Sequence, residues 1–193
     1  MVRLRVIEEY AHKNNIPIMM SDGIEFLTDF IKKNKVKRIL EIGSAIGYSA
    51  IRMALVDSDI NVVTIERDVL RYNEAVNNIN DFDLSDRISI INADALECEL
   101  TGEFDLIFID AAKAQYIKFF EKYKKNLAKD GVIISDNLSF HGMVDNIDGI
   151  TNRNTRQLVG KIIKYVDFLK NNLEFDTEFI SIGDGIGISR RKS

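Results

Sequence analysis

Two apolar segments of this sequence end in acidic or amide side chains. Asp110 follows the apolar run 104–109, and Asp136 and Asn137 follow the run 131–135. If both runs are parallel strands, these side chains share the carboxyl edge of a sheet, where ligands bind in such folds. Two carboxylates and an amide oxygen suit Mg²⁺ or a similar ion such as Mn²⁺, and the lack of histidine or cysteine among them argues against structural zinc. We therefore expect a divalent-metal site here; the alternative is that these side chains only cap the segments that follow.

Two residues near this group have side chains suited to proton transfer. Lys113 lies three residues after Asp110. Beside a divalent cation a lysine loses its proton more readily, so Lys113 and Asp110 are the candidate catalytic residues. Without the neighbouring acids, Lys113 would be interpreted as a surface residue. His141 lies in the polar stretch 138–154, and loops of that length are usually lids or binding surfaces, although a single loop histidine is more often incidental.

A second group of candidates surrounds a glycine-containing turn. The apolar run 39–42 predicts a buried strand, Gly43 and Gly47 interrupt it, and helical spacing resumes over 48–55. Strand, glycine turn and helix commonly form the binding site of a nucleotide-like ligand. The spacing differs from Gly-x-Gly-x-x-Gly, and a carboxylate at Glu41 would repel a pyrophosphate. The pattern thus favours a cationic sulfonium ligand over NAD; the alternative is a turn without any ligand.

Two further acids follow predicted strands. Glu66 lies about twenty residues after the glycine turn, where a carboxylate can accept both ribose hydroxyls. That position suits NAD as well as other adenosyl ligands, and the alternative is a solvated acid paired with Arg67. Asp94 is a candidate to bind an adenine amino group, or else to cap a helix that begins at Ala95.

The composition narrows the class of protein. The 193 residues have a formal net charge of −4, which gives no overall attraction to nucleic acid. Local basic residues such as Arg153 and Arg156 could still hold phosphates, or simply form a solvated helix face. Cys98 is the single cysteine, so we expect a reducing compartment and no internal disulfide. No apolar run approaches the ~18–20 residues of a membrane span, and no signal-peptide core is present, so we expect a cytoplasmic protein without a membrane partner.

The predicted elements place these residues in an α/β fold. Helical spacing covers 2–14, 21–35 with a cap at Ser21 or Asp22, 48–55, 69–80, 115–127 and 155–170; strands are predicted at 39–42, 61–65, 87–92, 104–109, 131–135, 174–182 and 186–190. Strands that alternate with helices predict a parallel, doubly wound sheet. The turn 183–185 predicts a closing hairpin and hence one antiparallel strand. We expect a single domain, 1–193, in which helices within 1–35 cover the site and 36–193 form the core.

Taken in chain order, several motifs resemble those of a known enzyme family. The motifs are Glu41–Ser49, Glu66, Ile109–Lys113, Ser135–Asn137 and Gly183–Gly185. Together they resemble the metal-dependent, S-adenosylmethionine-dependent O-methyltransferases of the catechol and caffeoyl-CoA type. Segments 110–116 and 136–144 and the arginine-rich helix start are most similar to the bacterial branch that methylates 5-hydroxyuridine in tRNA. The resemblance implies a Rossmann-like class I methyltransferase fold with a seven-stranded sheet.

The resemblance also implies a role for each candidate. The residues that would border S-adenosylmethionine are Glu41, Gly43 and Ser49 at its methionine part, Glu66 at the ribose, Asp94 and Ala95 at the adenine, Asp110, and Met19 or Met20 as a cover. The residues that would bind Mg²⁺ or Mn²⁺ are Asp110, Asp136 and Asn137. Lys113 would take the proton of the acceptor hydroxyl or stabilise its oxyanion.

The acceptor implied by the closest branch is a tRNA base. A small catechol-like phenol is the alternative within the same chemistry. A non-catalytic nucleotide- or RNA-binding module that keeps the fold is the alternative from another class. Relatives are often homodimers, so a homodimer is expected here.

Overall fold

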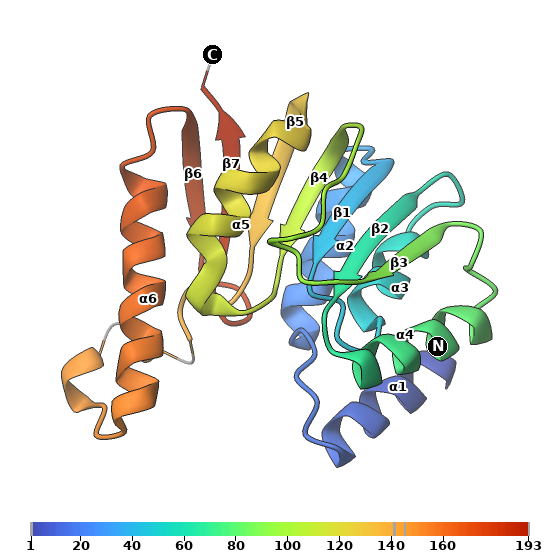
Figure 1. The fold of residues 1–193 in the computed structure, drawn as a ribbon, viewed down its shortest axis with the longest axis horizontal. Helices are drawn as coiled ribbons and strands as arrows, with labels where there is room; N and C mark the ends of the chain where they lie inside the picture. Colours follow the sequence, from blue (N-terminus) through green and yellow to red (C-terminus); the bar gives the residue numbers. More distant parts are fainter. Residues whose placement is uncertain (1, 141, 145, 193) are drawn as a thin grey trace.

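One seven-stranded sheet forms the centre of the computed structural model, which describes residues 2–140, 142–144 and 146–192. Its strands are β1 Arg38–Ile42, β2 Asn61–Glu66, β3 Ile88–Asn92, β4 Phe104–Ile109, β5 Leu127–Ser135, β6 Phe175–Ile180 and β7 Ile186–Arg191. They lie in the order β3-β2-β1-β4-β5-β7-β6 (Figure 1). β7 is antiparallel to β5 and β6, whereas the other neighbours pair in parallel. The predicted sheet, mostly parallel with one antiparallel strand from a C-terminal hairpin, is confirmed.

Helices cover both faces of this sheet (Figure 1). They are α1 Val2–Lys13, α2 Ser21–Lys33, α3 Tyr48–Ala54, α4 Val69–Asp81, α5 Tyr116–Tyr123 and α6 Arg153–Lys170, with short 3₁₀ turns η1 Lys113–Gln115, η2 Lys124–Asn126 and η3 Ile147–Gly149. Alternate side chains of β4 point to opposite faces, so Phe108 packs with α1, α2 and α3 while Ile107 packs with α5 and α6. Within the described residues, no helix is both long and apolar enough to cross a bilayer.

The crossover connections leave a crevice at the carboxyl edge of the sheet. β1 pairs with β2 on one side and with β4 on the other. The chain after β1 enters α3 on one face, whereas the chain after β4 enters α5 on the opposite face. The space between such diverging turns is where open α/β sheets bind ligands. Gly43 follows β1 and Asp110 follows β4, so both lie at this crevice.

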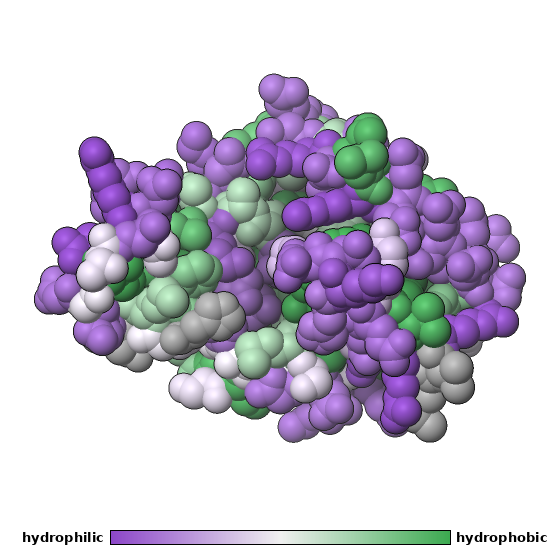
Figure 2. Space-filling model, turned by 90° about the horizontal axis from the view of Figure 1, so that it is seen from below, coloured by the Kyte–Doolittle hydropathy of each residue, from purple (hydrophilic) through white to green (hydrophobic). Residues whose placement is uncertain are grey.

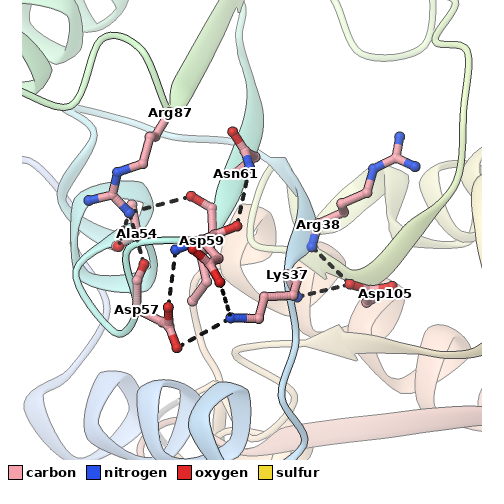
Figure 3. A network of polar contacts seen from close by, with 9 residues as sticks. Lys37, Arg38, Ala54, Asp57, Asp59, Asn61, Arg87 and Asp105 are labelled. Atoms are coloured by element: carbon pink, nitrogen blue, oxygen red, sulfur yellow. Dashed lines mark hydrogen bonds and ion pairs between the residues drawn. The ribbon is translucent and has the colours of Figure 1, made fainter.

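The opposite, amino edge of the sheet is fixed by a polar network (Figure 3). The carboxylate of Asp105 accepts hydrogen bonds from the backbone N–H groups of Lys37 and Arg38, both at 2.9 Å. Arg87 donates to the carbonyls of Ala54 at 2.7 Å and Asp57 at 2.9 Å. These bonds satisfy backbone groups where β1 begins and α3 ends. The polar groups of the amino edge that Figure 3 shows are therefore bonded within the protein, whereas open α/β sheets bind ligands at the carboxyl edge.

The boundary between α5 and β5 differs from the one predicted. The helical pattern over 115–127 breaks into η1, α5 and η2, and β5 begins at Leu127 rather than at Gly131. Leu127 pairs with Phe104, and the register shifts before Leu106 pairs with Val132. Pairing with β4 therefore overrides a local sequence that has helical character.

The start of one helix and the cap of another also differ from the prediction. α6 begins at Arg153, because the side chain of Asn152 accepts a hydrogen bond from Thr155 N at 3.0 Å and caps the helix. The predicted cap at Ser21 or Asp22 is wrong, since α2 begins at Ser21 and its N-cap residue makes no side-chain cap. Asp22 instead uses its carboxylate for contacts that are described below.

Candidate functional site

A cavity of about 510 Å³ opens at the carboxyl edge of the sheet. Figure 2 looks onto this edge and shows a hollow near the middle of the face. A volume of this size is typical of small-ligand sites. The predicted residues that line it are Met19, Gly43, Ser49, Glu66, Asp94, Ala95, Asp110, Lys113 and Asn137, together with Met20. The structure therefore brings together most of the side chains that the sequence singled out.

The glycine turn forms the floor of the cavity. Gly43 has φ +93° and donates its N–H to the carbonyl of Ile65 at 3.0 Å. A Cβ placed on Gly43 would lie 2.4 Å from the carbonyl oxygen of Asp110, so only glycine allows the turns after β1 and β4 to approach this closely. Ser44 lines the cavity, and no described residue forms a hydrogen bond with its buried Oγ. The turn thus presents an unsatisfied polar atom at the place where a polar ligand group would lie.

Glu66 holds this turn against β2. Its two carboxylate oxygens accept the backbone N–H groups of Ala45 at 2.9 Å and Asp68 at 2.8 Å. The side chain is only 7% exposed and still lines the cavity. Because each carboxylate oxygen can accept more than one hydrogen bond, Glu66 keeps capacity for two ligand hydroxyls. These backbone contacts explain the burial of Glu66 without an ion pair to Arg67.

Asp94 and Ala95 form the far end of the same wall. Asp94 Oδ1 accepts the N–H of Leu96 at 2.8 Å, which closes a turn and not the helix that the sequence suggested. The carbonyl of Ala95 accepts the hydroxyl of Tyr123 at 2.6 Å. Both residues are therefore held in fixed positions at the cavity wall.

Glu41 differs from the expectation that it borders the ligand. It is fully buried below the glycine turn and is not part of the cavity wall. Its two oxygens accept hydrogen bonds from Ser49 Oγ and Thr64 Oγ1, both at 2.5 Å. Burial raises the pKa of Glu41 to about 7, although the two hydroxyl hydrogen bonds oppose this change. Glu41 therefore orients Ser49, which does line the cavity.

Replacement of Glu41 by glutamine is expected to flatten the pH dependence of stability. The pKa of Glu41 is about 7 in the folded protein against an ordinary 4.5. The folded state therefore binds the proton of the Glu41 carboxyl more tightly than the unfolded state does. The stability that this protonation adds is complete below about pH 4.5 and is lost as the pH rises to about 7. Because glutamine does not titrate, the unfolding free energy of Glu41→Gln relative to wild type should rise by about 3 kcal/mol across that interval.

Denaturant unfolding at a series of pH values measures this difference. The exposed Glu25→Gln on α2 is the matched control and should run parallel to wild type. A difference between Glu41→Gln and wild type that stays constant with pH would show that Glu41 is ionised when folded.

The second predicted group lies where β4 and β5 end. Asp136 is 2% exposed, and its backbone N–H donates to the carbonyl of Ile109 at 3.2 Å. Asp136 Oδ1 is buried and has no hydrogen-bond partner among the described residues. Asn137 adopts φ +62°, and its Nδ2 lies 3.3 Å from Asp136 Oδ2. Lys113 Nζ donates to Asn137 Oδ1 at 2.5 Å, so Lys113, Asp136 and Asn137 form one connected cluster beside Asp110.

The charge of this cluster is unbalanced. Burial, and then the charge of Asp110, raise the pKa of Asp136 to about 7. Burial also raises the pKa of Asp110, while Lys113 opposes that change. Asp184, which is 4% exposed and lines the cavity, acts on both acids in the same direction. Among the described residues, this cluster holds three carboxylates and one ammonium group, which favours a bound cation.

Asp184 was missed as a site residue because its sequence signal, Gly-Asp-Gly, is also that of a hairpin turn. Among the residues that the structure describes, no three His, Cys, Asp or Glu side chains converge to hold a metal. An ion bound here would need the amide oxygen of Asn137 as one of its ligands. Amide and carboxylate oxygens together suit Mg²⁺ and Mn²⁺.

The loop after β5 contributes one clear neighbour to the cluster. The ring of Phe140 lies 6.0 Å from Lys113 Nζ and lines the cavity. His141, the loop histidine considered above, lies outside the described residues. Arg156 donates to the carbonyls of Ile150 and Asp148, both at 3.1 Å, and so fixes the start of α6 instead of facing the cavity. Arg153 is exposed on the first turn of α6.

Comparisons with known proteins point to one family. A family model described as O-methyltransferase matches residues 2–192. The solved structure of a provisionally named caffeoyl-CoA O-methyltransferase from Staphylococcus aureus is 38% identical, covers 98% of this chain and 92% of its own, and has a TM-score of 0.93. An O-methyltransferase from Bacillus cereus, solved in complex with SAH, is 28% identical, covers 100% of this chain and 91% of its own, and has a TM-score of 0.82. A caffeoyl-CoA O-methyltransferase from Populus kitakamiensis is 28% identical over 98% of this chain and 84% of the relative.

Proposed function

The chain belongs to the O-methyltransferase family, and from this membership we propose that it transfers a methyl group from S-adenosylmethionine to a hydroxyl oxygen. The proposal rests on one observation. The glycine turn lines the same cavity as Asp110, Lys113 and Asn137, which follow β4 and β5. One end suits an adenosyl ligand and the other suits an acceptor hydroxyl. The solved relative from Bacillus cereus, which binds SAH, supports the same cofactor here.

The cofactor would lie along the turns after β1, β2 and β3. Glu66 would accept the ribose hydroxyls, and Asp94 with Ala95 would contact the adenine. Ser49, oriented by Glu41, and the unpartnered Oγ of Ser44 would receive the amino-acid part. Met19 lines the adjoining wall and would cover the bound ligand.

We propose that a divalent ion, Mg²⁺ or Mn²⁺, binds at the other end of the cavity, which Asp110 and Asn137 line, whereas Asp136 is buried and does not line it. Within the described part of the chain, Asp136 Oδ1 is a buried carboxylate oxygen without a hydrogen-bond partner, and Asp110 and Lys113 are among its charged neighbours. Asp110, Asp136 and Asn137 would hold the ion. When bound, it would polarise the acceptor hydroxyl and favour its ionised form.

The protein's own residues would then complete the reaction. Lys113 is half-buried and donates a hydrogen bond to Asn137, which places its ammonium group to stabilise the oxyanion. To take the proton of the acceptor hydroxyl it would first have to lose a proton itself and act as a neutral amine. The buried positions of Asp136 and Glu41 hold both ends of the site rigid. Most of the rate enhancement would come from this fixed alignment of acceptor and methyl group.

We further propose 5-hydroxyuridine in tRNA as the acceptor. The sequence of the cluster segments 110–116 and 136–144 resembles the tRNA-modifying branch, and Arg67 and Arg71 line the cavity, where they could contact phosphates. A small catechol-like phenol is the second candidate. It is favoured by the phenolic substrate class in the names of the plant relatives and by the aromatic ring of Phe140 at the cavity wall.

One assay separates these acceptors. The purified chain, S-adenosylmethionine and Mg²⁺ are incubated with undermodified tRNA or with catechol, and the products are analysed by mass spectrometry. We expect methylated 5-hydroxyuridine, and we expect bulk tRNA from cells that lack the gene to have lost that nucleoside. Methylated catechol with unchanged tRNA would select the second candidate. SAH binding without transfer to either acceptor would point to a non-catalytic module.

A homodimer in the cytoplasm completes the proposal. Val6 and Tyr10 lie one turn apart on α1 and are 60% and 41% exposed, as expected for side chains that an oligomer covers. Cys98 as the lone cysteine favours a reducing compartment. Sedimentation velocity measures the assembly, and a purely monomeric mass would refute the dimer.

A further inference from the structure

One contact joins the start of α2 to the turn 183–185 between β6 and β7. The N–H of Gly183 donates to Asp22 Oδ2 at 3.0 Å, while Asp22 Oδ1 accepts the N–H of Gly23 at 2.9 Å. The two backbones also pack closely, because a Cβ on Gly183 would lie 3.3 Å from the Cα of Gly23. A Cβ on Gly23 would in turn lie 3.2 Å from Met19 Cε. The wall of the cavity that contains Met19 therefore rests on the turn 183–185.

The same turn is bonded to the opposite wall. The carbonyl of Asp184 accepts the N–H of Ser139 at 2.7 Å, and the carbonyl of Gly185 accepts the N–H of Leu138 at 2.9 Å. A Cβ on Gly185, which has φ +85°, would lie 2.7 Å from Ser139 N, so glycine is required for this approach. Leu138 directly follows Asn137, the amide of the acid cluster. The turn thus fixes the backbone that presents Asn137.

We propose that the turn 183–185 couples the wall that contains Met19 to the wall that presents Asn137, and that Asp22 is the positioning residue that completes this coupling. The inference rests on the proposed function in assigning the first wall to the cofactor and the second to the acceptor. A ligand that fixes one segment restricts the other, because both are bonded to one short turn. Asp22 contacts neither proposed ligand and acts through Gly183.

The test compares Asp22→Ala with wild type in the free protein and with SAH. Loss of one hydrogen bond to a charged acceptor is expected to raise the Kd for SAH about threefold to tenfold in calorimetry. Hydrogen exchange followed by NMR should be faster at the amides of Leu138 and Ser139, which Asp22 does not touch. SAH should slow the exchange of these amides in wild type and slow it less in the variant. The exchange rates of the β4 amides should be the same in Asp22→Ala and wild type. This comparison separates coupling from general destabilisation.

Two further variants sharpen the result. Asp29→Ala removes another exposed acid of α2 and should match wild type in both measurements. Asp22→Asn keeps one oxygen acceptor for Gly183 and should recover most of the loss. Wild-type exchange at Leu138 and Ser139 in Asp22→Ala would overturn the coupling, even if the Kd for SAH changes. Failure of wild type itself to bind SAH would reject the proposed function, whereas exchange in the free protein would still test the coupling.

Discussion

Asp136→Ala is expected to lower kcat/KM for methyl transfer by roughly 1,000-fold or more, the scale of several kcal/mol of lost charge stabilisation at the reacting oxygen. Asp136 is buried and has a carboxylate oxygen without a protein partner. No hydrogen bond from the residues that the structure describes accounts for that oxygen, so its contribution should appear in the reaction and not in folding. Steady-state kinetics with saturating S-adenosylmethionine measures the effect.

The isosteric variant Asp136→Asn separates reaction from folding. It keeps the side-chain shape but removes a buried charge, so the metal-free variant should unfold at the same denaturant concentration as wild type or at a higher one. Asp130→Ala alters an exposed acid on the same strand and should leave both activity and stability unchanged. If Asp136→Asn keeps wild-type activity with and without chelator, the ion site that we propose does not exist.

Sequence reasoning found this cluster because β4 and β5 are neighbours in a parallel sheet. Side chains that directly follow adjacent parallel strands must lie at one edge, so the sequence alone predicts that Asp110, Asp136 and Asn137 lie together. The contribution of Asp184 could not be found in the same way. It comes from the turn before the antiparallel strand β7, and a short Gly-Asp-Gly sequence carries the signal of a turn whether or not its acid faces a cavity.

The position of Glu41 shows a second limit of the sequence. A carboxylate one residue before the end of a buried strand points either to the ligand or below the turn, depending on the pleat. Glu41 lies opposite Thr64 in the register of β1 and β2, and the hydroxyls of Thr64 and Ser49 hold it below the turn. Spacing along the chain cannot reveal these partners, because they come from another strand and from α3.

The sequence also does not reveal which side chains form hydrogen bonds with backbone groups. Glu66 is predicted to bind a ligand, and its carboxylate also accepts hydrogen bonds from two backbone N–H groups that the sequence does not reveal. Arg156 was a candidate for phosphate binding, yet it is bonded to carbonyls at the start of α6. Side chains that satisfy irregular backbone can be recognised only when the path of that backbone is known.

Gly43→Ala is expected to reduce S-adenosylmethionine binding by roughly 100-fold or more, because the new methyl group collides with Asp110 and Ala111 in the turn after β4. The added Cβ would lie 2.4 Å from the carbonyl oxygen of Asp110 and 2.9 Å from Ala111 Cβ, and the residue would keep an unfavourable φ of +93°. Relief requires the turn after β1 to move away from the turn after β4. That movement would widen the cavity where cofactor and acceptor must meet, so both binding and transfer should fall.

A graded series of glycine variants tests whether contact with backbone causes the loss. At Gly47, with φ +82°, a Cβ would lie 3.2 Å from Ala75 Cβ, a much longer approach than the 2.4 Å contact at Gly43, so Gly47→Ala should lose less affinity. At Gly160 in α6 a Cβ meets nothing within 4 Å, so Gly160→Ala should bind normally and gain stability. Calorimetry with SAH ranks the three variants by affinity, and denaturant unfolding ranks them by stability. Equal affinity of Gly43→Ala and Gly160→Ala would mean that the close approach of the two turns is not what shapes the cofactor site.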